Sequence, residues 1–227
     1  MRDADTHAQR LQRFYAPQAE GYDEFRERLL HGRRELVMRL PIRPGARVVE
    51  LGAGTGRTFE FFGGRIGLME RADLVDLCPA LLERALQRHR GRGNVRVVEA
   101  DACAYLPERP VHCVYFSYAL SMIPDWRAAI DNALRILAPG GCIGAVDFHL
   151  PARDRGWRAR IDRQFWARWF GHDGVRLSGE HLSYLSDRVE PLDVRELRGA
   201  VPWMPLRAPY YIFVGRVRVA AAQARVA

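Results

Sequence analysis

Lysine is absent from the sequence, and all 35 basic residues are arginine. This absence excludes enzymes that form a Schiff base through a lysine side chain. A chain with arginine as its only basic residue besides histidine, and with much alanine, valine and glycine, is typical of a GC-rich coding sequence. The net charge of +8 therefore indicates an arginine-rich surface, which is either merely solvated or attracts an anionic partner. We expect no nucleic acid among the partners.

Cysteine is scarce, and no apolar run is long. The four cysteines form no C-x-x-C pair, so neither a zinc site nor a disulfide framework is indicated, and no metal site is predicted. No apolar run reaches the roughly 18 residues that cross a bilayer. The first residues, MRDADTHAQRLQR, contain no apolar signal core. We therefore expect a cytoplasmic protein, with peripheral association at the inner face of the membrane as the alternative.

Glycine, by contrast, is concentrated in one stretch, VVELGAGTG, at residues 48–56. An apolar run followed by alternate glycines predicts a buried strand that breaks into a tight turn before a helix. Glycine suits this turn because it adopts positive φ and lets a ligand approach bare backbone. The turn's amide groups and the helix N-terminus then form a polar cradle. The spacing differs from the dinucleotide pattern G-x-G-x-x-G, since no glycine stands at 57 or 59.

Predicted strands and helices alternate along the chain. Helices are expected over 58–62, from Pro79 onward, and in RAAIDNALRILAPGG, where Pro139 and two glycines stop the helix. This alternation predicts an α/β fold with a doubly wound, seven-stranded, mostly parallel sheet. The expected strands are 47–51, 72–77, 95–99, 111–117 and 142–148, with a final hairpin of 189–199 and 210–219.

The length of 227 residues suits one domain, which divides into four segments. Apolar residues at helical spacing predict two or three helices over 1–44, which form either a lid over a ligand or a cap that only packs, ahead of a ligand-binding core over 45–148. An insertion rich in arginine and tryptophan, 149–190, lies on the substrate side. The strand pair of 191–219 completes the domain.

Polar residues follow the predicted strands at the edge where ligands bind in this architecture. Asp76 stands twenty residues beyond Gly56, at the tip of the second strand, where its carboxylate is placed to accept both hydroxyls of a ribose. Asp101 follows the third strand, and it equally suits a turn cap. Tyr118 and His149 follow the fourth and fifth strands, and a surface position or a helix cap stays open for His149.

The pattern E-x-G-x-G-x-G resembles motif I of the class I S-adenosylmethionine (SAM) methyltransferases, and L-x-P-G-G before the fifth strand is similar to a second feature of that family. The resemblance implies a Rossmann-like fold, SAM as cofactor and S-adenosylhomocysteine (SAH) as product. It implies that Glu50 serves the methionine end of SAM and that Asp101 and Ala102 hold the adenine. The full set of implied cofactor-binding residues is Glu50, Gly52, Ala53, Gly54, Gly56, Asp76, Leu77, Asp101, Ala102 and Ser117.

A narrower resemblance lies in FSYALSMIPDW, residues 116–126, which is similar to a segment of the betaine lipid synthesis methyltransferases. Those enzymes add three methyl groups to the amine of diacylglyceryl-homoserine. Residues 22–36, 168–175 and 207–216 resemble further segments of that family. The resemblance implies a lipid amine as substrate and contact with an anionic membrane, while Tyr22, Tyr118 and His149 are the candidates to orient the amine or take its proton.

Two other functions fit the same residues. One is a small-molecule N- or O-methyltransferase that acts on a natural product or a quinone. The other is a SAM-binding regulatory protein without turnover. A nucleic-acid methyltransferase is disfavoured, because the fourth strand leads into FSYAL and not into an N-P-P-[YF] motif.

Overall fold

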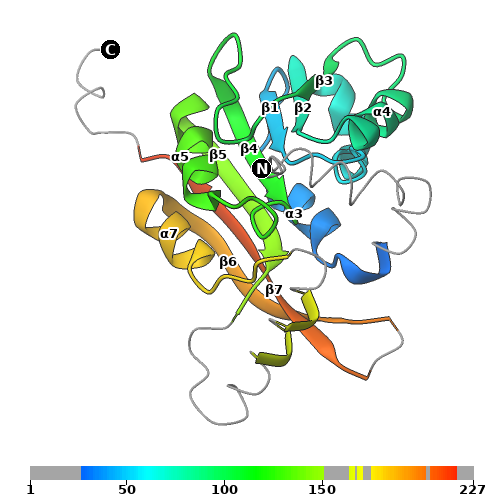
Figure 1. Ribbon diagram of the computed structural model, residues 1–227. Coiled ribbons are helices and arrows are strands. Elements are labelled where there is room, and N and C mark those ends of the chain that lie inside the picture. The colour runs from blue at the N-terminus through cyan, green and yellow to red at the C-terminus, as the bar shows by residue number, and fades with distance from the viewer. Residues whose placement is uncertain (1–26, 151–163, 167, 171–174, 203–204, 219–227) are drawn as a thin grey trace, which may run out of the picture.

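The computed structural model describes residues 27–150, 164–166, 168–170, 175–202 and 205–218. Seven strands form one sheet in the order β3-β2-β1-β4-β5-β7-β6, with helices on both faces (Figure 1). The strands β1 to β5 pair in parallel, whereas β7 is antiparallel to both of its neighbours. This arrangement confirms the predicted seven-stranded, mostly parallel sheet. The strands are β1 (Arg47–Leu51), β2 (Arg71–Asp76), β3 (Val95–Glu99), β4 (Val111–Ser117), β5 (Leu137–Phe148), β6 (Glu190–Ala200) and β7 (Arg207–Arg216).

Helices bury the two faces of the sheet in separate hydrophobic clusters. On one face, α3 (Arg33–Arg39) and the 3₁₀ helix η2 (Phe59–Leu68) pack over the central strands. On the other face, α5 (Trp126–Ile136) and α7 (His181–Arg188) cover β4, β5 and β7. This two-sided burial explains why the central strands are almost wholly apolar. Within the described ranges, no helix combines the length and the hydropathy that crossing a membrane requires.

Local sequence signals fix where two of these helices begin. Pro79 occupies the first turn of α4 (Pro79–Arg88), a position where its missing N–H costs nothing. The Asp125 side chain caps α5 by accepting a hydrogen bond from the Ala128 N–H, at 3.0 Å. Both starts place the preceding loop at the carboxyl edge of the sheet.

The largest differences between the predicted and the observed elements concern one helix and two strands. The helix expected over 58–62 is the 3₁₀ helix η2, whose course is broken at Gly63, where φ is 56°. The fifth strand begins at Leu137 and not at residue 142, because the Pro139 segment lies within a register shift between the pairs Val111/Leu137 and Cys113/Cys142. The last strand begins at Arg207 and ends at Arg216, earlier than predicted at both ends.

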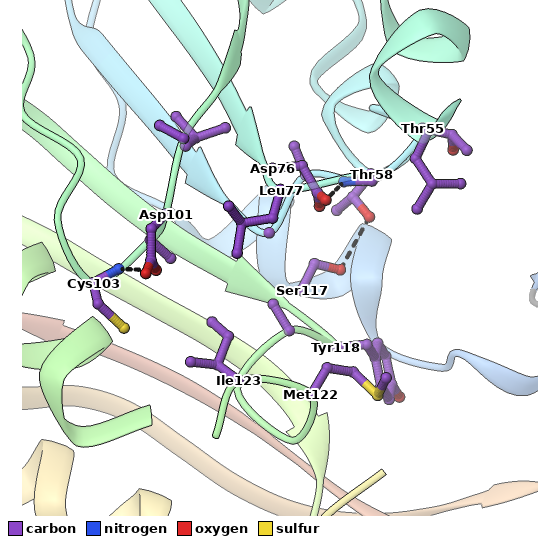
Figure 2. Close-up of a pocket in the computed structure, with 18 of the residues that line it drawn as sticks. Thr55, Thr58, Asp76, Leu77, Asp101, Cys103, Ser117, Tyr118, Met122 and Ile123 are labelled. Atoms are coloured by element: carbon purple, nitrogen blue, oxygen red, sulfur yellow. Dashed lines mark hydrogen bonds between the residues drawn. The ribbon is translucent and has the colours of Figure 1, made fainter. Parts of the chain in front are cut away.

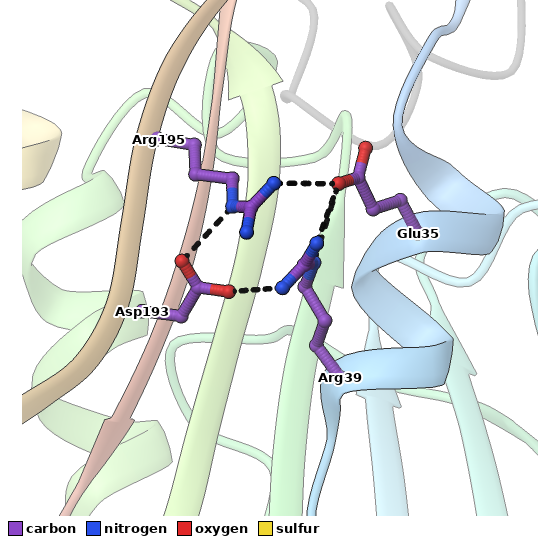
Figure 3. Close-up of polar contacts among 4 residues, drawn as sticks. All are labelled: Glu35, Arg39, Asp193 and Arg195. Atoms are coloured by element: carbon purple, nitrogen blue, oxygen red, sulfur yellow. Dashed lines mark hydrogen bonds and ion pairs between the residues drawn. The ribbon is translucent and has the colours of Figure 1, made fainter.

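The N-terminal lid expected over 1–44 is described only from residue 27, so most of that prediction lies outside the described residues. Its described part includes α3, which is tied to the distant strand β6 by a closed ring of four charged side chains (Figure 3). Arg39 bonds Glu35 at 2.9 Å and Asp193 at 2.6 Å. Arg195 bonds the same two carboxylates, at 3.2 Å and 3.1 Å. The ring fixes the orientation of α3 across the sheet.

Packing of α3 supplies a direct test of this fold. Leu36 is fully buried against the sheet, whereas Met38 on the same helix is 63% exposed. Leu36→Ala should lower the free energy of unfolding by about 2–5 kcal/mol, because it leaves a cavity in the core. Met38→Ala should change it by no more than about 0.5 kcal/mol. Urea unfolding of both variants checks this, and equal losses would contradict the placement of α3.

Candidate functional site

A pocket opens at the carboxyl ends of the parallel strands, where the predicted polar residues converge (Figure 2). Its wall is built from the turn after β1, the end of β2, the residues after β3 and the long segment after β4. Its lining residues are 52–55, 75–77, 100–103, 117–119 and 122–125, together with Leu30, Arg33, Arg57, Thr58 and Leu81.

The glycine-rich turn adopts a backbone that explains its sequence. Gly52, Gly54 and Gly56 have φ of 76°, 54° and 69°, in the left-handed region that favours glycine. Gly52 also approaches the segment after β4, since a Cβ there would lie 2.4 Å from the Ala119 Cβ. At Gly54 a Cβ would lie 3.9 Å from the Leu81 Cδ1, an ordinary contact, so it is the positive φ that favours glycine there.

Asp76 links this turn to the end of β2. One carboxylate oxygen accepts the Gly54 N–H at 2.8 Å, and the other accepts the Cys78 N–H at 2.9 Å. Burial raises the pKa of Asp76, although the backbone N–H donors at Cys78 and Gly54 oppose the shift. Each oxygen keeps acceptor capacity. The side chain therefore suits a pair of ligand hydroxyls while it orders the turn.

The opposite end of the pocket is formed by Asp101 and Ala102. Asp101 is exposed, and its carboxylate accepts the Cys103 N–H at 2.8 Å. From α5, the buried Asn132 amide donates to the carbonyls of Ala102 and Tyr105, at 2.8 Å and 2.9 Å. Asn132 therefore holds this loop, and sequence reasoning missed it. Its only sequence signal is a polar residue on the apolar face of a predicted helix.

Tyr118 forms part of the pocket wall in a constrained conformation. Its φ of 54° is the only positive value among the non-glycine residues that the structure describes. Its hydroxyl donates to the His31 carbonyl at 2.8 Å, and its ring packs edge-on against Phe148, with centroids 4.7 Å apart. Burial raises the pKa of Tyr118 well above its ordinary value. The hydroxyl thus keeps its proton and is already engaged as a donor.

Glu50 lies beneath the turn and does not line the pocket. It is 1% exposed, and its carboxyl group accepts the Tyr115 hydroxyl at 2.8 Å. Burial raises the pKa of Glu50 to about 8, while Tyr115 and the positive charge of Arg33 oppose the rise. Arg33 does line the pocket. Sequence reasoning did not single it out from the other arginines.

His149 is directed away from the pocket. Its neighbour Phe148 faces Tyr118, and successive residues of an extended chain point to opposite faces. The His149 ring consequently packs edge-on against Tyr211 and bonds Glu196 at 2.9 Å. The structure does not favour His149 as a group that contacts a substrate in this pocket.

The predicted residues thus separate into three groups. Tyr22 lies outside the described residues. Glu50, Gly56 and His149 lie away from the pocket wall. The residues that the structure brings together around one pocket are Gly52, Ala53, Gly54, Asp76, Leu77, Asp101, Ala102, Ser117 and Tyr118.

Comparisons with known proteins match the part of the chain that supplies most of the pocket wall. Residues 48–141 match the family model described as "Methyltransferase domain". The ubiquinone/menaquinone biosynthesis C-methyltransferase UbiE of Shewanella halifaxensis is 32% identical over 116 residues, which are 49% of this chain and 46% of that protein. The trans-aconitate 2-methyltransferase of Methylobacterium nodulans is 32% identical over 126 residues, 55% of this chain and 47% of that protein. The chain thus spans about half the length of these relatives.

A solved structure extends the likeness in fold beyond the matched segment. The N-methyltransferase NodS from Bradyrhizobium japonicum, in complex with SAH, superposes with a TM-score of 0.67 at 19% sequence identity. The alignment covers 94% of this chain and 99% of the NodS chain. At this identity the likeness concerns the fold alone.

The buried carboxyl group of Glu50 predicts a pH dependence of stability. Glu50 keeps its proton in the folded protein up to about pH 8, whereas its ordinary pKa is 4.5. The unfolded chain therefore releases a proton that the folded state retains, and stability falls as the pH rises between these values. Glu50→Gln should remove this fall. The free energy of unfolding of the variant should therefore rise relative to that of the wild type from pH 5 to pH 8.

Urea unfolding at several pH values, without ligand, measures the effect. Glu83→Gln, on the exposed face of α4, is the matched control and should follow the wild type. Parallel pH profiles for Glu50→Gln and the wild type would contradict the assignment of a buried, protonated carboxyl group.

Proposed function

We propose that this chain, whose residues 48–141 match the family model described as "Methyltransferase domain", transfers methyl groups from SAM to an amine acceptor. The observation that carries this proposal is the convergence of the glycine-rich turn, Asp76 and Asp101 on one pocket. These groups provide backbone amides, a hydroxyl-binding carboxylate and a second carboxylate at the far end. Their order along the pocket matches the methionine, ribose and adenine parts of SAM.

The residues present fit this cofactor. Gly54 and Arg33 both line the pocket, and the methionine end would lie beside them. Asp76 would accept the ribose hydroxyls, and Asp101 with Ala102 would hold the adenine. When bound, SAM supplies an electrophilic methyl group on a sulfonium. The protein then has to align the acceptor with that methyl group and exclude water.

The segment after β4 provides the acceptor side of the pocket. Ala119, Met122 and Ile123 line it with apolar surface, and Leu30 closes it from the N-terminal side. Tyr118 contributes a hydroxyl that is held by the His31 carbonyl, so its role is to shape the wall and not to accept a proton. Among the residues suggested by the sequence for handling the proton, Tyr22 is the one that we keep as a proposed contact.

For the acceptor, we propose the amine of diacylglyceryl-homoserine, which would be methylated three times to a betaine lipid. The segment 116–126, whose sequence suggested this acceptor, supplies much of the pocket wall. From Tyr118, aromatic rings continue through Phe148 to Phe170, with Phe148 and Phe170 centroids 4.2 Å apart. The path ends near the stacked rings of Phe165 and Trp169, which are 39% and 38% exposed. An exposed aromatic pair of this kind suits acyl chains at an anionic membrane surface.

A soluble small molecule, such as a quinone or a natural product, is the second candidate acceptor. The names of the relatives favour it, since UbiE is a C-methyltransferase of ubiquinone and menaquinone biosynthesis and the other acts on trans-aconitate. The surface on the acceptor side of the pocket is apolar, so it suits an apolar quinone as well as a lipid. A SAM-binding regulatory protein without turnover is the third candidate.

The cofactor assignment predicts the effect of Asp76→Ala. Calorimetric titration with SAH should show binding to the wild type and an affinity at least tenfold weaker in the variant. The reason is that two ribose hydroxyls lose their acceptor, at about 1–3 kcal/mol for each abandoned group. Asp131→Ala, on the exposed face of α5, is the matched control and should bind normally. Equal affinity in Asp76→Ala and the wild type would rule out the assignment.

The lipid assignment predicts a product that mass spectrometry can detect. A strain that supplies diacylglyceryl-homoserine and expresses this protein should accumulate the same lipid with three added methyl groups. A strain expressing Asp76→Ala should accumulate far less. If the purified protein binds SAH, leaves this lipid unmethylated and methylates a soluble amine, phenol or quinol, the small-molecule function replaces the lipid function. Binding of SAH without transfer to any acceptor would favour the regulatory function.

A further inference from the structure

Two consecutive residues at the C-terminal end of α4 hold two consecutive carbonyl groups of the glycine-rich turn. The Arg88 guanidinium donates to the Thr55 carbonyl at 2.5 Å, and the His89 Nε2 lies 3.1 Å from the Gly56 carbonyl oxygen. Each contact spans 33 residues of the sequence. Both hydrogen bonds therefore hold the turn from the side away from the pocket, since neither Arg88 nor His89 lines the pocket.

His89 is built to act as a neutral donor. It is 4% exposed, and its ring packs edge-on against Phe59, with centroids 5.3 Å apart. Burial lowers the pKa of His89. Its Nδ1 is buried and has no hydrogen-bond partner in the part of the chain that the structure describes. These facts favour the tautomer in which Nε2 carries the proton and donates it to the Gly56 carbonyl.

The fit between the two residues is close. A Cβ at Gly56 would lie 2.8 Å from the His89 Nε2, and the φ of Gly56 is 69°. Because the peptide unit is planar and trans, a Gly56 carbonyl that faces His89 directs the Arg57 N–H to the opposite side. Arg57 and Thr58 line the pocket. The orientation of the turn's amides thus depends on the contact with α4.

We propose that His89 is a positioning residue for the cofactor, which sets the amides of the glycine-rich turn by holding the Gly56 carbonyl. Arg88 assists by holding the Thr55 carbonyl. Neither side chain touches the ligand, since His89 and Arg88 are absent from the pocket wall. The inference rests on the proposed SAM site, and it assigns part of the cofactor affinity to α4.

Substitution of His89 tests this role by SAH binding, which needs no acceptor. His89→Leu removes the donor and should weaken SAH affinity about three- to tenfold, the value of one hydrogen bond. His89→Gln carries an amide donor at similar reach and should bind within about twofold of the wild type. Gln87→Leu, on the exposed face of the same helix, is the matched control. Thermal unfolding of each variant without ligand separates affinity from stability.

The outcomes distinguish the inference from the function on which it rests. A His89→Leu variant that is less stable yet binds SAH like the wild type would overturn the positioning role alone. Absence of SAH binding by the wild type would overturn both the cofactor assignment and the positioning role. If leucine at this site prevents folding, Arg88→Met takes its place at a side chain that is 21% exposed. Unchanged SAH affinity in that variant would then overturn the inference.

Discussion

The reversal of strand order between β1 and β4 is the constraint on which the site depends. From β1 the sheet grows outward through β2 and β3, and from β4 it grows in the opposite direction. The connections that follow β1 and β4 therefore leave on opposite faces, which opens a space at their carboxyl ends. The turn at Gly52 and the segment at Ala119 border that space and approach each other closely. Every lining residue from the core strands reaches the pocket from this edge.

The fold and the convergence of several polar residues on one pocket were predictable because they follow from local rules. Apolar runs of strand length, glycines at turns and a proline at a helix start each indicate a structure within a few residues. Asp76 and Asp101 could be placed because parallel strands end at a common edge, so a residue after one strand lies near a residue after the next. The strand expected over 95–99 agrees with the structure in its bounds, and so does the strand over 111–117.

The other site residues could not be predicted, because their roles depend on contacts between distant parts of the chain and on the face to which each side chain points. Nothing in the sequence distinguishes Arg33 from the other arginines, and Asn132 is marked only by its place on the apolar face of a predicted helix, because the partners of both residues lie on other elements. The position of His149 after a strand did not reveal its role, because a shift of one residue along an extended chain turns a side chain to the other face of the sheet. Glu50 similarly points into the protein, and its place beneath the turn became evident only with Tyr115 beside it.

The charged ring between α3 and β6 also lies at the edge of the sheet. β6 is an edge strand, and an unpaired strand edge offers its N–H and C=O groups to the strand of any neighbouring molecule. Here the edge carries Pro191, which has no backbone N–H, and a register shift follows that residue. The side chains of Asp193 and Arg195 already pair with α3. A second chain that added a strand here would have to disturb these pairs, so the ring also disfavours pairing along this edge.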